Sequence, residues 1–236
     1  MERTAIVTGG TGGLGAAVVA RLLDQGWRVV VPWIVERELE RVEECSGLEL
    51  IQADLFRPDS VQEVVAAGAA AADAPLRGLV NLVGGFAAGG RVHETPIEDF
   101  ERQFTLNLRA TYLMTQAFVS RVLSDAPGEG QADAAIVCVG TRAVRRPFSG
   151  AAGYISSKAA VLSFTEAVAL EYRDDGIRCN AILPSVIDTP GNRASMPKAD
   201  FSKWVRPEDI AAVISHLLSE DAGPVSGAAI PVYGRA

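Results

Sequence analysis

A tyrosine and a lysine stand four residues apart in the segment "YISSK", as Tyr154 and Lys158. Residues at this spacing lie on one face of a helix, so the ammonium group can approach the phenol. A nearby ammonium group stabilises the phenolate and lowers the pKa of tyrosine, which is about 10 in water. The pair is therefore either a solvated pair on a helix surface or a proton donor with the charge that makes it more acidic.

The glycine-rich segment "TGGTGGLG", residues 8–15, is the second feature that could do chemistry. Gly9, Gly13 and Gly15 allow a sharp turn and the close approach of a ligand. A helix that begins here would offer free N–H groups and a partial positive charge to a phosphate. A glycine turn that binds nothing is the alternative. The position between a predicted strand and a predicted helix favours phosphate binding.

The composition limits the classes of protein that need to be considered. The chain has 236 residues, is 48% hydrophobic and carries a net charge of −7. This length suffices for one buried core, so we predict a single domain over residues 1–236. The negative charge argues against nucleic-acid and anionic-membrane partners. The three cysteines have no metal or redox spacing, and no signal peptide or membrane span is predicted, so we expect no metal site and a cytoplasmic location.

Short apolar segments alternate with longer amphipathic segments along the whole chain. Strands are predicted over residues 4–8, 28–33, 48–54, 78–85, 135–140, 177–184 and 227–233. Helices are predicted over residues 13–25, 36–45, 59–72, 96–123 (with a kink near Asn107), 153–172 and 206–219, with a loop over 124–134. Strands that are apolar throughout are typical of a sheet covered by helices on both faces. The sequence therefore predicts an α/β fold with a doubly wound parallel sheet.

The order of these features resembles that of the short-chain dehydrogenases/reductases. The glycine turn matches in spacing, Tyr154 and Lys158 match the catalytic pair, and Asn107 in "TLNL" matches an asparagine of the fourth helix. Asn81 matches the motif after the fourth strand, although Leu82-Val83 departs from it. The resemblance covers nearly the whole chain. It implies a Rossmann-like fold of about seven strands and an NAD(P)-dependent oxidoreductase.

The resemblance also implies a role for each of four residues. Tyr154 would exchange a proton with the substrate oxygen while hydride moves to or from nicotinamide. Lys158 would bind the nicotinamide ribose and lower the pKa of Tyr154. Asn107 would bend its helix and hold a water molecule in a proton relay. Thr141 stands where the family has a serine, and it keeps the hydroxyl; the alternative is a threonine that only ends a strand.

The same resemblance places the cofactor at the carboxyl ends of the strands. Asp54 matches the position that contacts adenine, and Ser185 replaces a glycine of the family in "ILPSVIDT". The expected cofactor contacts are Gly9, Gly13, Leu14, Gly15, Trp33, Asp54, Leu55, Asn81, Val83, Gly84, Tyr154, Lys158, Pro184, Ile187 and Thr189.

The choice between NAD and NADP stays open at this point. A carboxylate at the end of the second strand would bind the adenosine ribose and repel a 2′-phosphate. Trp33 occupies that position, and Gly12 occupies the turn position where users of NADP often carry a basic residue. Arg37 could reach a phosphate or lie solvated on a charged helix.

The segment around residues 189–206 resembles the substrate lid of dihydropteridine reductases. Two departures stand against a shared substrate: Trp33 replaces the aspartate with which that group binds NADH, and Asn107 and Thr141 restore the ordinary carbonyl-reductase set. The aromatic and apolar side chains that could line a substrate pocket, or simply pack, are Phe86, Phe148, Met196, Phe201 and Trp204.

Several functional alternatives remain. The first is hydride transfer on a carbonyl or alcohol; the others are reduction of a quinonoid dihydropterin and a non-catalytic dinucleotide sensor. Arg142, Arg145 and Arg146 could attract an anionic small-molecule substrate or lie solvated in a loop. The resemblance implies a homo-oligomer, dimer or tetramer, formed through the two long helices.

Overall fold

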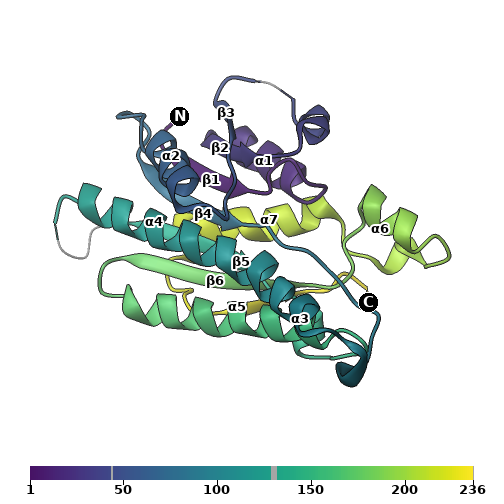
Figure 1. The fold of residues 1–236 in the computed structure, drawn as a ribbon. Helices are drawn as coiled ribbons and strands as arrows, with labels where there is room; N and C mark the ends of the chain where they lie inside the picture. The colour runs from purple at the N-terminus through teal and green to yellow at the C-terminus, as the bar shows by residue number, and fades with distance from the viewer. Residues whose placement is uncertain (44, 129–131, 236) are drawn as a thin grey trace.

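The computed structural model of the protein describes residues 1–43, 45–128 and 132–235. Seven parallel strands form one sheet in the order β3-β2-β1-β4-β5-β6-β7 (Figure 1). The chain runs outward from β1 to β3, crosses back to β4 and runs outward to β7, which confirms the predicted doubly wound sheet. The strands are β1 (Thr4–Thr8), β2 (Arg28–Trp33), β3 (Leu48–Gln52), β4 (Leu76–Asn81), β5 (Ala134–Val139), β6 (Ile177–Pro184) and β7 (Ala229–Val232).

Helices cover both faces of the sheet. One apolar cluster joins the sheet to α1 (Gly15–Asp24) and α7 (Pro207–Leu218). A second cluster on the opposite face joins it to α2 (Pro58–Gly68), α4 (Ala110–Asp125) and α5 (Ala152–Glu171). Successive strand residues alternate between the two clusters, so Val29 and Val31 face one layer of helices and Val30 the other. This two-sided burial explains why the strands are apolar throughout.

The helix predicted over residues 96–123 is interrupted at the predicted kink. It consists of α3 (Ile97–Phe104), a π-helical turn (Thr105–Arg109) and α4. A π turn widens the helix by one residue and often marks a functional position. Here it turns Asn107 inward, where its side chain is only 1% exposed.

Other predicted boundaries differ from the structure. The charged segment 36–45 forms only a short 3₁₀ helix, η1 (Glu36–Arg41), because it has no buried residue to hold a longer helix; residue 44 lies outside the described residues. The fourth strand ends at Asn81, and the glycines that follow leave the sheet. The loop predicted over 124–134 begins two residues later, after α4, and its residues 129–131 lie outside the described part of the chain.

The remaining short helices border the carboxyl edge of the sheet or the surface. They are η2 (Val92–Glu94), η4 (Arg142–Val144), α6 (Pro190–Ser195), η5 (Phe201–Lys203) and η6 (Glu220–Ala222). Figure 1 shows α6 standing out from the body of the molecule. Within residues 1–43, 45–128 and 132–235, every helix is too short or too polar to cross a membrane.

Phe118 in α4 provides a test of the core. Its side chain is fully buried between α4 and the sheet. We expect Phe118→Ala to lower the free energy of unfolding by about 3–5 kcal/mol, because it removes buried apolar area and leaves a cavity. Urea unfolding measures the change. Gln116→Ala, an exposed site on the same helix, serves as the control, and equal effects of the two substitutions would contradict the described packing.

Candidate active site

The glycine turn lies between β1 and α1, as predicted. Gly9 has a φ of +65°, and the N–H of Gly12 donates to its carbonyl oxygen at 3.0 Å. A Cβ atom at Gly15 would overlap that same carbonyl oxygen, so the turn admits no side chain there. The N-terminus of α1 therefore stays open, and its backbone approaches closely enough to receive a phosphate group.

The turn is tied to two other parts of the carboxyl edge. The Thr8 hydroxyl oxygen accepts hydrogen bonds from the N–H groups of Leu82 and Val83 at 3.0 and 3.3 Å. A Cβ atom at Gly13 would lie 2.9 Å from the Thr189 methyl group, so the turn also touches the start of the lid. The turn, the segment after β4 and the segment after β6 thus meet at the carboxyl edge of the sheet, where ligands of open parallel sheets bind.

The structure gathers the predicted cofactor residues at this edge, but three of their side chains are engaged elsewhere. The Asn81 amide donates to the Thr115 hydroxyl at 3.2 Å, and its side chain is 3% exposed. Leu55 belongs to the buried core. Asp54 accepts a hydrogen bond from the Phe56 N–H at 3.0 Å and shapes its own turn. At these three positions, a ligand can contact only the backbone or the outermost atoms of the side chain.

Thr141 and Tyr154 meet at the end of β5. Thr141 caps η4 by accepting from the Ala143 N–H at 3.3 Å, and its hydroxyl lies near enough to the Tyr154 phenol to oppose the rise in the pKa of that phenol. The ring of Phe86 packs edge-on against Tyr154 with 5.0 Å between centroids. The closeness of the two hydroxyl groups argues against a threonine that merely ends the strand.

Lys158 lies one helical turn beyond Tyr154 and is 6% exposed. Its ammonium group donates to the Val139 carbonyl oxygen at 2.8 Å. Burial lowers the pKa of Lys158 to about 8, and the nearby Cys138 thiol opposes this shift. Tyr154 and Lys158 are therefore not a solvated pair on a helix surface.

The side chain of Asn107 joins three elements. Its oxygen accepts from the Gly85 N–H at 3.0 Å, and its NH₂ group donates to the Ser157 hydroxyl at 3.1 Å. Ser157 in turn donates to the Tyr154 carbonyl oxygen at 2.8 Å. A Cβ atom at Gly84 would lie 2.7 Å from the Asn107 oxygen and 3.1 Å from the Lys158 nitrogen, so both polar groups converge on this glycine.

The expectation that Lys158 lowers the pKa of Tyr154 is not met. Burial raises the pKa of Tyr154, and the nearby Thr141 hydroxyl opposes the increase. Lys158 is not among the groups that lower this pKa. The reason is burial itself, because a phenolate in an apolar environment is poorly solvated.

Ser157 is a site residue that the sequence analysis did not identify. A signal was present, since a serine three residues after Tyr154 in a helix can hydrogen-bond the tyrosine carbonyl oxygen. The further bond from Asn107 depends on tertiary packing and has no counterpart in local spacing.

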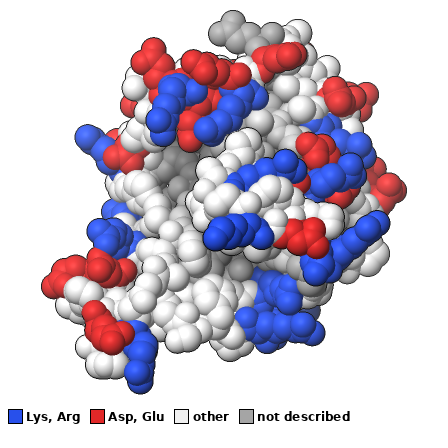
Figure 2. Space-filling model, turned by 90° about the vertical axis from the view of Figure 1, so that its right-hand side faces the viewer, with Lys and Arg blue, Asp and Glu red and all other residues white. Residues whose placement is uncertain are grey.

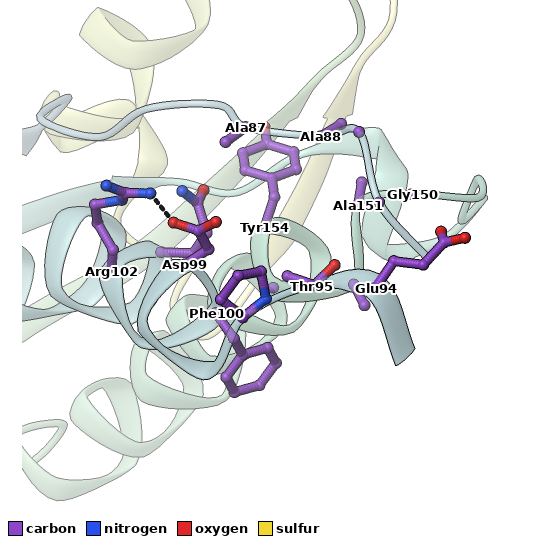
Figure 3. Close-up of a pocket in the computed structure, with 16 residues that line it drawn as sticks. Ala87, Ala88, Glu94, Thr95, Asp99, Phe100, Arg102, Gly150, Ala151 and Tyr154 are labelled. Atoms are coloured by element: carbon purple, nitrogen blue, oxygen red, sulfur yellow. Dashed lines mark hydrogen bonds and ion pairs between the residues drawn. The ribbon is translucent and has the colours of Figure 1, made fainter. Parts of the chain in front are cut away.

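A cavity of about 260 Å³ lies beside Tyr154 (Figure 3). It is enclosed by the segment 87–90, by α3 and by the start of α5. The Gly89 N–H donates to the Gly150 carbonyl oxygen at 2.9 Å and closes one side. Figure 3 shows the exposed ion pair of Asp99 and Arg102 at one end of this cavity.

The predicted lid, residues 189–206, contains α6 and η5 and is held at both ends. Arg193 forms two hydrogen bonds with Asp188, at 2.5 and 2.7 Å, and packs over the Phe201 ring at 4.9 Å. Phe201 also stacks on Trp204 at 4.7 Å. These two aromatic side chains therefore pack within the lid, whereas Phe86, Phe148 and Met196 are exposed.

The arginines after Thr141 have different surroundings. The Arg142 guanidinium lies 5.5 Å from the Tyr233 ring centroid, while Arg145 and Arg146 are exposed. On the face shown in Figure 2, Lys and Arg side chains stand in separate groups among acidic ones. Within the described part of the chain, no three His, Cys, Asp or Glu residues form a metal-binding group.

Comparison with known proteins agrees with this geometry. Residues 3–200 match the family model of the short chain dehydrogenases. The chain belongs to this family of oxidoreductases. It is 30% identical to a 2-(R)-hydroxypropyl-CoM dehydrogenase of Xanthobacter autotrophicus, over 99% of this chain and 98% of the relative. It is 28% identical to glucose 1-dehydrogenase 2 of Bacillus subtilis, over 98% and 93% of the two chains.

A solved short-chain dehydrogenase structure shares the same fold. A 3-ketoacyl-(acyl-carrier-protein) reductase from Brucella melitensis, complexed with NADH, superposes with a TM-score of 0.85 at 27% identity, over 99% of this chain and 98% of the other. The fold is also that of ElxO with NADP bound, with a TM-score of 0.88 at 23% identity, over 99% and 98% of the chains.

The buried ammonium group of Lys158 leads to a pH-dependent prediction. Between about pH 8 and the ordinary lysine pKa of 10.5, the unfolded chain binds more protons than the folded chain, so this residue's contribution to stability rises with pH. We expect Lys158→Met to raise the free energy of unfolding at pH 7 by about 1–3 kcal/mol. The substitution removes the cost of burying a charge, and the loss of one hydrogen bond offsets part of this gain. The gain should shrink toward pH 10.

Urea unfolding at pH 7, 9 and 10 measures this difference. The exposed Lys198→Met variant should show no such trend. A Lys158→Met variant that is less stable than the wild type by the same amount at each pH would contradict the prediction.

Proposed function

We propose that the protein is an NAD(P)-dependent oxidoreductase that transfers hydride between nicotinamide and a carbonyl or alcohol substrate. In this proposal residues 1–236 form a single domain, with residues 189–206 as its substrate lid. The observation that carries it is the convergence of the Thr141 hydroxyl and the Tyr154 phenol one helical turn from the buried Lys158. Relatives that are dehydrogenases, and a similar structure complexed with NADH, support it.

The residues at the carboxyl edge fit a dinucleotide. The glycine turn, including Leu14, would hold the pyrophosphate against the N-terminus of α1. Trp33 and Asp54 would border the adenosine, and Thr189 would close over the turn, which it already touches. The backbone of Val83 and Gly84, together with Pro184 and Ile187, would border the nicotinamide end. When bound, the cofactor supplies or accepts the hydride.

Tyr154 would act as the general acid in reduction and as the general base in oxidation. Its raised pKa keeps the phenol protonated at neutral pH, which suits proton donation to a carbonyl oxygen. Thr141 would hydrogen-bond the same substrate oxygen and orient it. Lys158 would bind the nicotinamide ribose. Asn107 would hold the segment at Gly85 in place and contribute to a proton relay.

Two alternatives remain distinguishable by experiment. The lid's resemblance to dihydropteridine reductases makes a quinonoid dihydropterin a candidate substrate. A dinucleotide sensor without turnover would bind NADH or NADPH and consume neither. The sensor has no use for a buried proton donor, so the pair Thr141 and Tyr154 favours an enzyme.

The assembly and location are further proposals. Tyr112 on α4 is 47% exposed and Leu170 on α5 is 69% exposed, and such apolar side chains on the two long helices favour a homo-oligomer. Free cysteines suit the cytoplasm.

The proposal is tested by the absorbance of reduced nicotinamide with a panel of ketones, quinones and a quinonoid dihydropterin. We expect Tyr154→Phe to lower kcat at least 100-fold while NADH binding persists, because the proton donor is lost and the cofactor contacts are not. Thr141→Ser should keep more activity than Thr141→Val, since only serine retains the hydroxyl. Full turnover by Tyr154→Phe would refute the mechanism, and cofactor binding without turnover across the panel would favour the sensor.

A further inference from the structure

The cavity beside Tyr154 contains a buried amide that lacks a partner. Gln103 on α3 lines the cavity and is 5% exposed. Within the described residues, its Oε1 atom and the Asn81 Oδ1 atom are the two buried side-chain oxygens without a hydrogen bond. Such an atom costs about 1–3 kcal/mol, and a native protein usually has a reason to keep it.

The other polar groups around the cavity already have partners. Glu94 accepts from the Arg91 N–H at 2.8 Å, and Thr95 donates to the Arg91 carbonyl oxygen at 3.0 Å. Asp99 and Arg102 neutralise each other at the rim. The remaining wall is apolar or glycine backbone, and it includes Phe100. The vacant acceptor is therefore Gln103. The Glu94 carboxylate keeps its negative charge, but its side chain is 53% exposed, so this charge is solvated.

We propose that this cavity binds the portion of the substrate next to its reacting carbonyl or alcohol, and that Gln103 accepts a hydrogen bond from a neutral N–H or O–H group there. The inference rests on the proposed function, since it places the reacting oxygen at Tyr154. The volume of about 260 Å³ corresponds to eight or nine water molecules of about 30 Å³ each, which suits a small amide-bearing or hydroxyl-bearing group. The substrate class is thus a ketone or secondary alcohol with a neutral hydrogen-bond donor.

A matched pair of ketones tests this role. Acetoacetamide carries an N–H donor, and methyl acetoacetate replaces that NH₂ group with a methoxy group, which cannot donate. We expect the wild type to prefer the amide. Gln103→Met should lower the amide-to-ester ratio of kcat/KM about tenfold, because about one hydrogen bond to the amide is lost. The change should appear chiefly in KM. The substitution should also raise the Tm of the free protein, because it removes the unsatisfied oxygen.

The exposed Gln116→Met variant on α4 is the control for both readouts. An unchanged ratio, or a lower Tm with equal losses on both ketones, would overturn the proposal and identify Gln103 as a packing residue. Absence of turnover and of any Tm shift with acetoacetamide would also count against it. Turnover of methyl acetoacetate would still support the proposed function, so the two failures are distinguishable.

A second, independent observation concerns the other end of the cofactor site. The short helix η1 folds back onto the glycine turn, where the Thr11 hydroxyl donates to Glu38 at 3.1 Å. Arg41 donates to the Thr11 carbonyl oxygen at 3.2 Å and pairs with Glu38 at 3.1 Å. Thr11 is only 3% exposed. A carboxylate therefore stands at the turn although the end of β2 offers Trp33.

We infer that Glu38 replaces the missing strand-end carboxylate as the group that selects the cofactor. Its place beside the glycine turn, in the short helix that follows β2, would let this carboxylate meet the adenosine ribose and repel a 2′-phosphate. Arg41 forms an ion pair with Glu38 and so holds this carboxylate in position. The protein should then prefer NADH to NADPH.

Titration of the protein with NADH and with NADPH, followed by nicotinamide fluorescence, tests the inference without turnover. We expect Glu38→Gln to bring the two dissociation constants about tenfold closer together, by improving NADPH binding, while Glu40→Gln on the same helix does not. Tighter binding of NADPH by the wild type, or equal effects of the two substitutions, would overturn it.

Discussion

The hydrogen bonds of Asn107 hold the candidate active site together. Through one side chain, the π turn between α3 and α4 is joined to Gly85 after β4 and to Ser157 on α5. Ser157 passes the link to the backbone of Tyr154. These elements pack in separate places on the sheet, and their ends could otherwise shift independently. A regular helix would direct Asn107 differently, so the wide turn is the condition for this connection.

The hydrogen bonds of Asn107 lie in the interior of the protein, and burial explains the pKa shifts of the neighbouring Lys158 and Tyr154. Lys158 has little exposure, and it is stabilised by the carbonyl oxygen of Val139 at the end of a strand. An ammonium group in this environment stabilises nearby negative charge more strongly than it would in water. The same burial raises the pKa of Tyr154, so the resting phenol is neutral.

The layers of the fold could be predicted from the sequence because their causes are local. Apolar strands, helical spacing and the glycines at 9, 13 and 15 each restrict the backbone where they stand. The boundaries of η1 and β4 could not be predicted, since they depend on whether the neighbouring elements offer an apolar surface. The kink at Asn107 was predicted through family resemblance; its partners Ser157 and Gly85 come from packing between distant segments.

The electrostatics of the site was the least predictable part. Spacing correctly placed Tyr154 and Lys158 on one helix face, yet it carries no information on how deeply they are buried. Burial decides the direction of both pKa shifts. In the same way, the sequence marks Gln103 as one polar residue among several on α3, and only the three-dimensional structure shows that its oxygen lacks a partner.

The groups that cost stability lie close together at the carboxyl edge of the sheet. A buried ammonium group and two unsatisfied amide oxygens together destabilise the folded state by several kcal/mol. This is a large share of the roughly 5–15 kcal/mol that separates folded from unfolded domains. The fully buried strands behind them, covered by helices on both faces, offset this cost. Polar groups held in place before a ligand arrives need no reorganisation when charge develops beside them. The core therefore provides the stability that lets Lys158 remain buried and the two amide oxygens remain unpaired, and their shared location distinguishes a site from scattered packing defects.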